Sequence, residues 1–245
     1  MLSSYAGTAR PYNPLYYYRA RGYLRQPTRV HSREAVTRPS DSVHHIAVLR
    51  SIGEFSWDNI KQVAALLSAA FYEDEEAWNR GTANAREPPL AGALFGWASL
   101  FAVLTQHVVY GNNYLTLLAS ENEKVVGCCG LSFDSAPDDV TAATGLAAGS
   151  QYGLLTGLAV AHAHRRCGVA SKLLAAAAAA TAARLPPPAM LALLVARTNT
   201  PALRLYVRQG FEEQPDWVDA RWQAEAEKGK VGKPRRLLLV RLLSS

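Results

Sequence analysis

The chain has 245 residues, of which 49% are apolar and 19% charged, and its formal net charge is +6 at neutral pH. This length fits one large domain or one ordinary domain with extensions, and the apolar content excludes a chain that is disordered throughout. The positive charge favours anionic partners such as phosphates, nucleic acid or acidic lipid, although a solvated basic surface explains it equally well. Three cysteines without zinc-ligand spacing, two of them adjacent, indicate a reducing compartment rather than a disulfide framework.

Residues 1–43 differ in kind from the rest and form a basic extension rich in arginine and tyrosine. Six arginines precede the first acidic residue, Glu34, and prolines interrupt the segment. It has no apolar secretory core, and its arginine-rich, acid-poor composition predicts a mitochondrial location, with the cytoplasm as the alternative. Interleaved arginine and tyrosine in residues 1–40 also suit docking on a protein or RNA partner of a large complex. A plain disordered tail is the third interpretation.

Residues 44–245 read as one globular domain that opens with a strand and two helices. A strand is expected at 45–50, followed by a helix capped by Asp58 and ended by the acidic cluster at 73–76, where a solvated helix end is favoured over a metal site. The uncharged run after Pro88 predicts an apolar helix over 90–105. A membrane span needs about 20 apolar residues, so this helix is expected to be buried in the core or against a partner rather than to cross a membrane.

The second half of the domain alternates strands with helices, and 134–150 is expected to be a loop. The expected strands cover residues 114–119, 125–133, 152–160, 189–196 and 237–243, with another beginning at Phe211. The expected helices cover 168–184, 201–209 and 217–228. Hairpins in front and strand–helix alternation behind predict a mixed α/β class with a largely antiparallel front half.

The junction between the strand at 152–160 and the helix at 168–184 carries the first functional signal. Arg165 and Arg166 follow the strand, and Gly168 permits a tight turn and close backbone approach. The helix that begins there directs unpaired N–H groups and the positive end of its dipole outward. An anion, and a diphosphate especially, fits that concavity. The alternative is an ordinary strand-to-helix turn with two solvated arginines.

A second motif follows the strand at 189–196, and the two together resemble the GNAT superfamily of acyl-CoA-dependent N-acyltransferases. Arg165, Gly168 and Ala170 match the family's Arg/Gln-x-x-Gly-x-Gly/Ala coenzyme motif. The later family pattern is matched by Asn199, Ala202, Leu205, Tyr206, Gly210 and Phe211. The resemblance covers about residues 152–215 strongly and 44–133 weakly. It implies a GNAT-type, mostly antiparallel mixed sheet flanked by helices, with acetyl-CoA as the cofactor and no metal.

The same resemblance implies roles for individual residues. Backbone groups of Leu158, Ala159 and Val160 would bind the pantetheine arm where two central strands splay apart, and Asn199 would help to position it. Tyr206 would protonate the departing thiolate as general acid. The pyrophosphate would be held by the segment Arg165, Arg166, Cys167, Gly168, Val169, Ala170 and Ser171.

The chain departs from the family pattern where a general base is expected. Many members carry a glutamate on the strand equivalent to 152–160 and some carry another on the next strand, whereas this chain has Thr156 and Leu194 at those places. An amine nucleophile must lose a proton before it attacks. Substitute bases, or residues that order water for this purpose, are His162, His164, Asp138 and Asp139.

Two functions remain open at this point. The first is an N-acetyltransferase that transfers an acetyl group from acetyl-CoA to a primary amine: a protein N-terminus, a lysine or a small amine. The second is a catalytically lapsed GNAT-fold subunit, docked in a large mitochondrial assembly such as a ribosome or membrane complex through its N-terminal extension. No specificity for DNA is evident.

Overall fold

The computed structural model describes residues 44–54, 56–79, 91–228 and 235–243. Every element that the structure describes lies in the unit formed by residues 38–245. The basic extension predicted for residues 1–43 therefore lies outside the described residues. Among the helices that the structure describes, none is long and apolar enough to cross a membrane.

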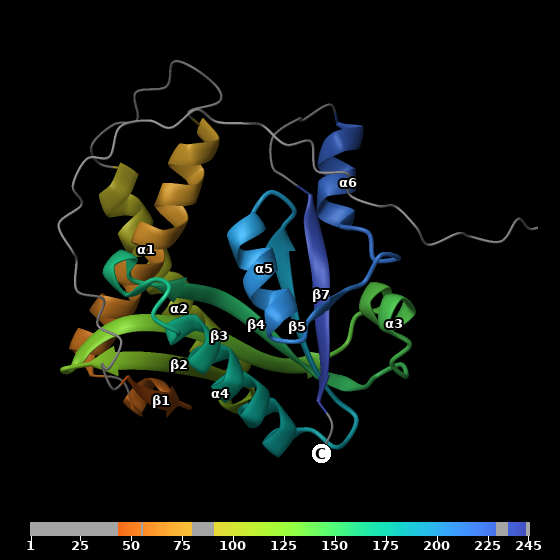
Figure 1. Cartoon of the computed structure of the whole chain (residues 1–245), viewed down its shortest axis with the longest axis horizontal. Helices are drawn as coiled ribbons and strands as arrows, with labels where there is room; N and C mark the ends of the chain where they lie inside the picture. Colours follow the sequence, from red (N-terminus) through yellow and green to blue (C-terminus); the bar gives the residue numbers. More distant parts are fainter. Residues whose placement is uncertain (1–43, 55, 80–90, 229–234, 244–245) are drawn as a thin grey trace, which may run out of the picture. The chain divides into compact units, whose positions relative to one another are not determined.

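Seven strands form one sheet in the order β1-β2-β3-β4-β5-β7-β6 (Figure 1). All neighbouring pairs are antiparallel except β4 with β5, which confirms the predicted mixed, mostly antiparallel class. The strands are β1 (His45–Leu49), β2 (Tyr114–Glu121), β3 (Lys124–Ser135), β4 (Gln151–Val160), β5 (Ala189–Ala196), β6 (Glu212–Glu213) and β7 (Arg236–Leu243).

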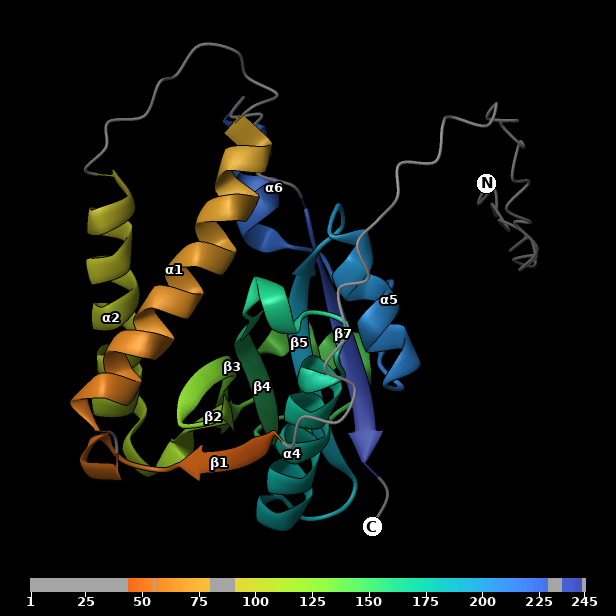
Figure 2. The ribbon, with the colours of Figure 1, turned by 60° about the vertical axis from the view of Figure 1, so that its left-hand side comes forward.

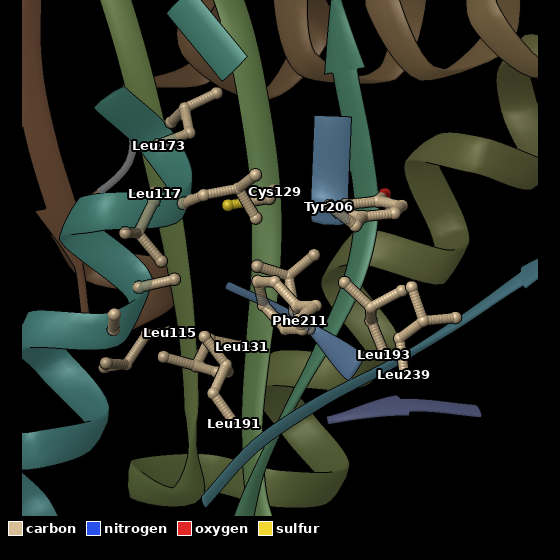
Figure 3. Close-up of a cluster of buried hydrophobic side chains, with 14 of the residues drawn as sticks. Leu115, Leu117, Cys129, Leu131, Leu173, Leu191, Leu193, Tyr206, Phe211 and Leu239 are labelled. Carbon is tan, nitrogen blue, oxygen red and sulfur yellow. The ribbon is translucent and has the colours of Figure 1, made fainter. Parts of the chain in front are cut away.

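One face of the sheet carries helices α4 (Val169–Arg184) and α5 (Thr200–Arg208). Because side chains of a strand alternate between faces, every second residue of β2, β3 and β5 enters the core on this side. Leu117, Leu131 and Leu191 are fully buried there, together with Leu173 and Leu174 from α4. Figure 3 shows this cluster, in which leucines from β2, β3, β5, β7 and α4 lie around Phe211.

The opposite face carries two smaller clusters. Helices α1 (Trp57–Asn79) and α2 (Ala91–Tyr110) lie along each other (Figure 2). They pack through Val63 and Val103 against Leu118 and Cys128. Further along the sheet, α3 (Asp138–Thr144) packs against β4, β5 and β7, with Trp217 in the same cluster. The last helix, α6, spans Ala220–Glu227, and three short 3-10 helices cover Ile52–Glu54, Gly111–Asn113 and His162–His164.

Three sequence predictions need correction. Helix α1 begins at Trp57 and is capped by Ser56, whose Oγ accepts from the Asn59 N–H at 3.1 Å, so Asp58 lies in the first turn. A side-chain oxygen one residue earlier thus satisfies the orphan amide. The acidic cluster at 73–76 lies inside α1, which continues to Asn79. The expected loop at 134–150 contains helix α3, closed by Gly145 in the left-handed conformation at φ 72°.

Helix α2 ends at Tyr110, five residues beyond the predicted end, and its described side chains lie in two different environments. Val103 and His107 are buried, whereas Phe101, Val108 and Val109 are exposed. The helix therefore uses one side for the core and leaves apolar side chains on another.

Candidate active site

The parallel pair at the centre of the sheet separates soon after it forms. Only three residues of each strand pair, Gly153–Leu155 of β4 with Leu191–Leu193 of β5, although β4 continues to Val160 and β5 to Ala196. Beyond Leu155 the edge of β4 that faces β5 has no ladder. This is the divergence of central strands that the sequence resemblance implied.

A β-bulge in β4 lies at the same place. Thr156 pairs with Gly130 and Ala159 pairs with Cys128, so two residues of β4, Gly157 and Leu158, oppose a single residue of β3. Gly157 has φ 59°, a left-handed conformation that side chains other than glycine rarely adopt. A bulge bends its strand and redirects the side chains that follow. Here the bulge begins directly after the ladder between β4 and β5 ends.

The loop that follows β4 forms an open turn at the start of α4. Arg166 and Gly168 have φ 66° and 80°, and Gly168 is the N-cap of the helix. No side chain caps this end, and a Cβ built on Gly168 would meet nothing within 4 Å. The amides of the first turn are therefore directed into open space together with the positive end of the helix dipole, which suits an anion.

The predicted coenzyme-binding residues differ in exposure along this segment. Arg165, Arg166 and Gly168 are exposed; Ala159 and Val169 are buried; Leu158, Val160, Cys167, Ala170, Ser171 and Asn199 are intermediate. The Arg165 Nε donates to the Val160 carbonyl at 3.3 Å, which holds the arginine against the end of β4. The Cys167 thiol points to the Arg165 carbonyl at 3.6 Å, a contact that fits a packing residue.

Helix α5 is fixed at both ends by its own motif. The Asn199 Oδ1 accepts from the Ala202 N–H at 3.2 Å as N-cap. At the other end Gly210 has φ 79°, its N–H donates to the Val207 carbonyl, and the Phe211 N–H donates to the Tyr206 carbonyl. This pair of bonds is a Schellman motif, and it confirms the predicted left-handed glycine terminus.

Tyr206 stands at the margin of the main core cluster. Its ring packs edge-on against Phe211 with centroids 5.8 Å apart, and Cys129 lies beside it (Figure 3). Burial, with a smaller effect from Cys129, raises the pKa of the Tyr206 phenol to about 12. The phenol therefore stays protonated at neutral pH and can act as a hydrogen donor.

The two motifs meet in space. The Gln209 Nε2, at the C-terminal end of α5, donates to the Ser171 Oγ in the first turn of α4 at 3.4 Å. The open turn at Gly168, the separated strands and Tyr206 thus belong to elements that contact one another.

Two of the four candidate bases have side-chain hydrogen-bond partners, and the other two are exposed. His164 is paired with Glu121 through Nε2 at 2.8 Å, and Asp139 accepts from the Trp217 Nε1 at 2.8 Å. His162 and Asp138 are exposed, in the turn before α4 and the first turn of α3. Thr156 is exposed on β4, where the family glutamate is expected.

A cavity of about 240 Å³ opens on the opposite face of the sheet, over β4, β5 and β7. It is lined by apolar residues that include Leu154, Leu194 and Trp217, and by the Asp219–Arg236 pair. The Arg236 guanidinium donates two hydrogen bonds to Asp219, at 2.7 and 2.9 Å, and these bonds lower the pKa of Asp219 to about 2. Asp219 is therefore held as a paired carboxylate and is unsuited to act as a base.

Sequence reasoning missed a polar row on this same face. Thr116, Gly130 and Thr156 are register partners on β2, β3 and β4, and the Tyr114 hydroxyl lies over Gly130. His107 of α2 adjoins the row through Thr116. The available signal was Gly130 itself, because a glycine inside an apolar strand often marks the close approach of another group.

Comparison with known proteins identifies the class that this fold and these motifs define. The acetyltransferase (GNAT) family profile matches residues 69–211, more than half of the chain. The chain belongs to the GNAT acetyltransferase family, which confirms the resemblance and indicates acyl transfer from an acyl-CoA. A search of curated proteins finds no match.

Solved structures similar to this chain include several acetyltransferases. A GNAT-family acetyltransferase from Staphylococcus aureus Mu50 is 12% identical, with 82% of this chain and 100% of that chain covered and a TM-score of 0.49. An acetyltransferase from Streptococcus agalactiae 2603 is 16% identical, with coverage of 81% and 98% and a TM-score of 0.48. The ribosomal-protein-S18-alanine N-acetyltransferase from Escherichia coli is 16% identical, with coverage of 83% and 96% and a TM-score of 0.47.

Proposed function

We propose that the chain is an N-acetyltransferase that moves an acetyl group from acetyl-CoA to a primary amine. The observation that carries this proposal is the open, uncapped start of α4 at Gly168, next to the divergence of β4 and β5. An open helix start binds many kinds of anion, and a short parallel ladder by itself binds nothing in particular. Their combination matches the two parts of the coenzyme, a diphosphate and an extended amide-containing arm.

The residues present fit such a molecule. The amides of Val169, Ala170 and Ser171 suit the diphosphate, because Gly168 leaves the space before them open. The exposed Arg166 adds positive charge in the same turn. The unladdered edge of β4 around Leu158 offers backbone partners to an extended arm, as a neighbouring strand would.

The chemistry then divides between two polar groups. When bound, the coenzyme supplies an acyl group activated as a thioester. The Tyr206 phenol is protonated at neutral pH, as tyrosines ordinarily are, and is suited to donate a hydrogen bond and then its proton to the departing sulfur. Burial also favours the neutral thiol over the thiolate, and this helps the transfer. Asn199 supports this arrangement as the cap of α5.

The test is a matched pair of substitutions in the first turn of α4. Ala170→Asp places a carboxylate beside the expected diphosphate, and Ala170→Asn has almost the same shape without the charge. An acid in the first turn stabilises a helix, so folding should not suffer. We expect Ala170→Asp to weaken acetyl-CoA affinity at least tenfold in isothermal titration, with Ala170→Asn near wild type.

Equal affinity of both variants for acetyl-CoA would refute the site assignment. Release of coenzyme A with a panel of peptide and small primary amines tests the transfer itself. Tight binding of acetyl-CoA without release for any amine would contradict the proposed catalysis and support the non-catalytic subunit instead.

A further inference from the structure

The cavity over β4, β5 and β7 adjoins the place where the two central strands separate. Leu155 and Leu193 form the last pair of the parallel ladder, so Thr156 and Leu194 are the first residues beyond it. Leu155 and Leu193 belong to the main core cluster. Because side chains alternate between the faces of a strand, Thr156 and Leu194 both lie on the opposite face. Leu194 lines the cavity, which therefore reaches the opening between the strands on the side away from α4 and α5.

The cavity is bounded by apolar side chains from three strands, one helix and the segment after β6. The Trp217 Nε1 donates to the Asp139 Oδ2 at 2.8 Å, and this bond joins the segment after β6 to α3 (Figure 1). Two sides of the cavity are therefore fixed to each other by a direct contact. The apolar lining residues are Val140, Leu154, Leu194, Trp217 and Leu238.

The charged groups of the cavity balance one another. Its lining includes two carboxylates, from Asp139 and Asp219, and two guanidinium groups, from Arg221 and Arg236. The Asp219 carboxylate accepts directly from Arg236 at 2.7 Å. A charged group that entered would lose its water without meeting a net counter-charge, whereas an apolar group gains free energy by leaving water. The cavity is therefore suited to an uncharged, apolar group.

Size and position indicate what such a group would belong to. The volume of about 240 Å³ is below the roughly 300–1,000 Å³ of pockets that enclose a drug-sized molecule, so it suits a single branched or aromatic group. Leu154 in the cavity and Thr156 at the opening are two residues apart on one face of β4, which is about 7 Å. A group held over Leu154 would thus place an amine, two carbon atoms away from it, beside Thr156.

We propose that this cavity binds the apolar group of the acceptor, so that the substrate is a primary amine separated by two carbon atoms from a branched aliphatic or aromatic group. This inference rests on the proposed transferase function and deepens it by naming the acceptor class. A peptide with leucine or phenylalanine as its first residue has this chemistry, and so does a small arylalkylamine. A lysine side chain or a polyamine lacks the apolar group.

Matched acceptors test the class and separate its two sources. One pair is 2-phenylethylamine and ethylamine, and the other is the peptides Phe-Gly-Gly and Gly-Gly-Gly. At saturating acetyl-CoA we expect kcat/KM to be at least tenfold higher for the apolar member of one pair or both, since a single methylene in a hydrophobic pocket is worth about tenfold or more. The pair with the larger ratio identifies the source of the acceptor. Equal values within both pairs would overturn the proposal and leave the transferase function intact.

A substitution that fills the cavity tests where this preference arises. Leu194 is 36% exposed, so Leu194→Trp can extend into the cavity without displacing a buried side chain. We expect it to lower the ratio of kcat/KM for 2-phenylethylamine over ethylamine at least tenfold, through KM for the larger amine. Leu242→Trp is the matched control, because Leu242 is 66% exposed and lies on the same face of β7 as Leu238 but outside the cavity. An unchanged ratio in Leu194→Trp, or equal losses in both variants, would contradict the assignment.

A binding measurement on the wild-type chain is independent of turnover. The indole N–H resonance of Trp217, identified by its loss in Trp217→Phe, should shift in a saturable way when 2-phenylethylamine is added in the presence of coenzyme A. Ethylamine at the same concentrations should leave it in place. Absence of the shift would overturn the cavity assignment even if amines are acetylated. A chain that binds acetyl-CoA but acetylates no amine refutes the transferase function, and the acceptor class with it.

Discussion

The two faces of the sheet differ in the polar side chains that they bury, although the same strands form both faces. On the face of α4 and α5, leucines fill the space and Tyr206 is the one titratable hydroxyl in the described core cluster. On the face of α1 and α2, Thr116, Tyr114 and His107 are buried together: the His107 Nε2 lies 2.9 Å from the Thr116 Oγ1, and the His107 and Tyr114 rings pack edge-on. The same strands thus separate an apolar packing face from one that buries polar side chains.

The largest effect is expected from the phenol on the α5 face. Tyr206→Phe keeps the ring on Phe211 but removes the donor, so kcat should fall about 100-fold or more while acetyl-CoA affinity is kept. Steady-state kinetics and titration check this result. Tyr152→Phe removes a buried phenol from the opposite face and serves as control. Equal losses in both variants would indicate general damage and contradict a special role for Tyr206.

A methyl group added at the centre of the row should cost stability. Gly130→Ala brings a Cβ into the Tyr114 hydroxyl and within 2.9 Å of the Thr156 Oγ1. Overpacking of this kind lowers the free energy of unfolding by about 1–3 kcal/mol, as measured by urea denaturation. In Gly53→Ala the added Cβ meets only the Ser51 Oγ at 3.9 Å, so that variant should unfold like wild type. A neutral Gly130→Ala would show that the row is loosely packed.

The smallest effect is expected at the Asp219–Arg236 pair, whose role is to stabilise the fold. The pKa of Asp219 is lowered to about 2, mainly by Arg236, so its stabilisation is complete above the unfolded pKa near 4 and is lost as pH falls toward 2. Thermal melts of Asp219→Asn should show a loss of about 2 kcal/mol at pH 7 that shrinks as the pH is lowered. The exposed Asp216→Asn is the control. A loss that does not depend on pH would contradict the charge pairing.

The difference between the faces also explains what could be predicted. The strands, α4 and the ends of α5 follow from local signals: period-two leucines, Gly168 before an alanine-rich helix, and Gly210 after Tyr206. The coenzyme motif is local in the same sense. The row at Gly130 depends instead on which residues of β2 and β4 stand opposite it, and register between distant strands is not encoded locally. Helix α3 was missed because seven residues hold too few turns to show a period.

The short parallel ladder has a consequence for the architecture of the domain. Strands β1 to β4 form one antiparallel half-sheet and β5, β7 and β6 form another, and only three residues of each central strand join them. The centre of the sheet is therefore a narrow junction between two half-sheets. In the chain, α4 connects the two halves between β4 and β5. An extended molecule with amide groups that enters the open part of this junction would occupy the place of a strand. It would then contact both half-sheets.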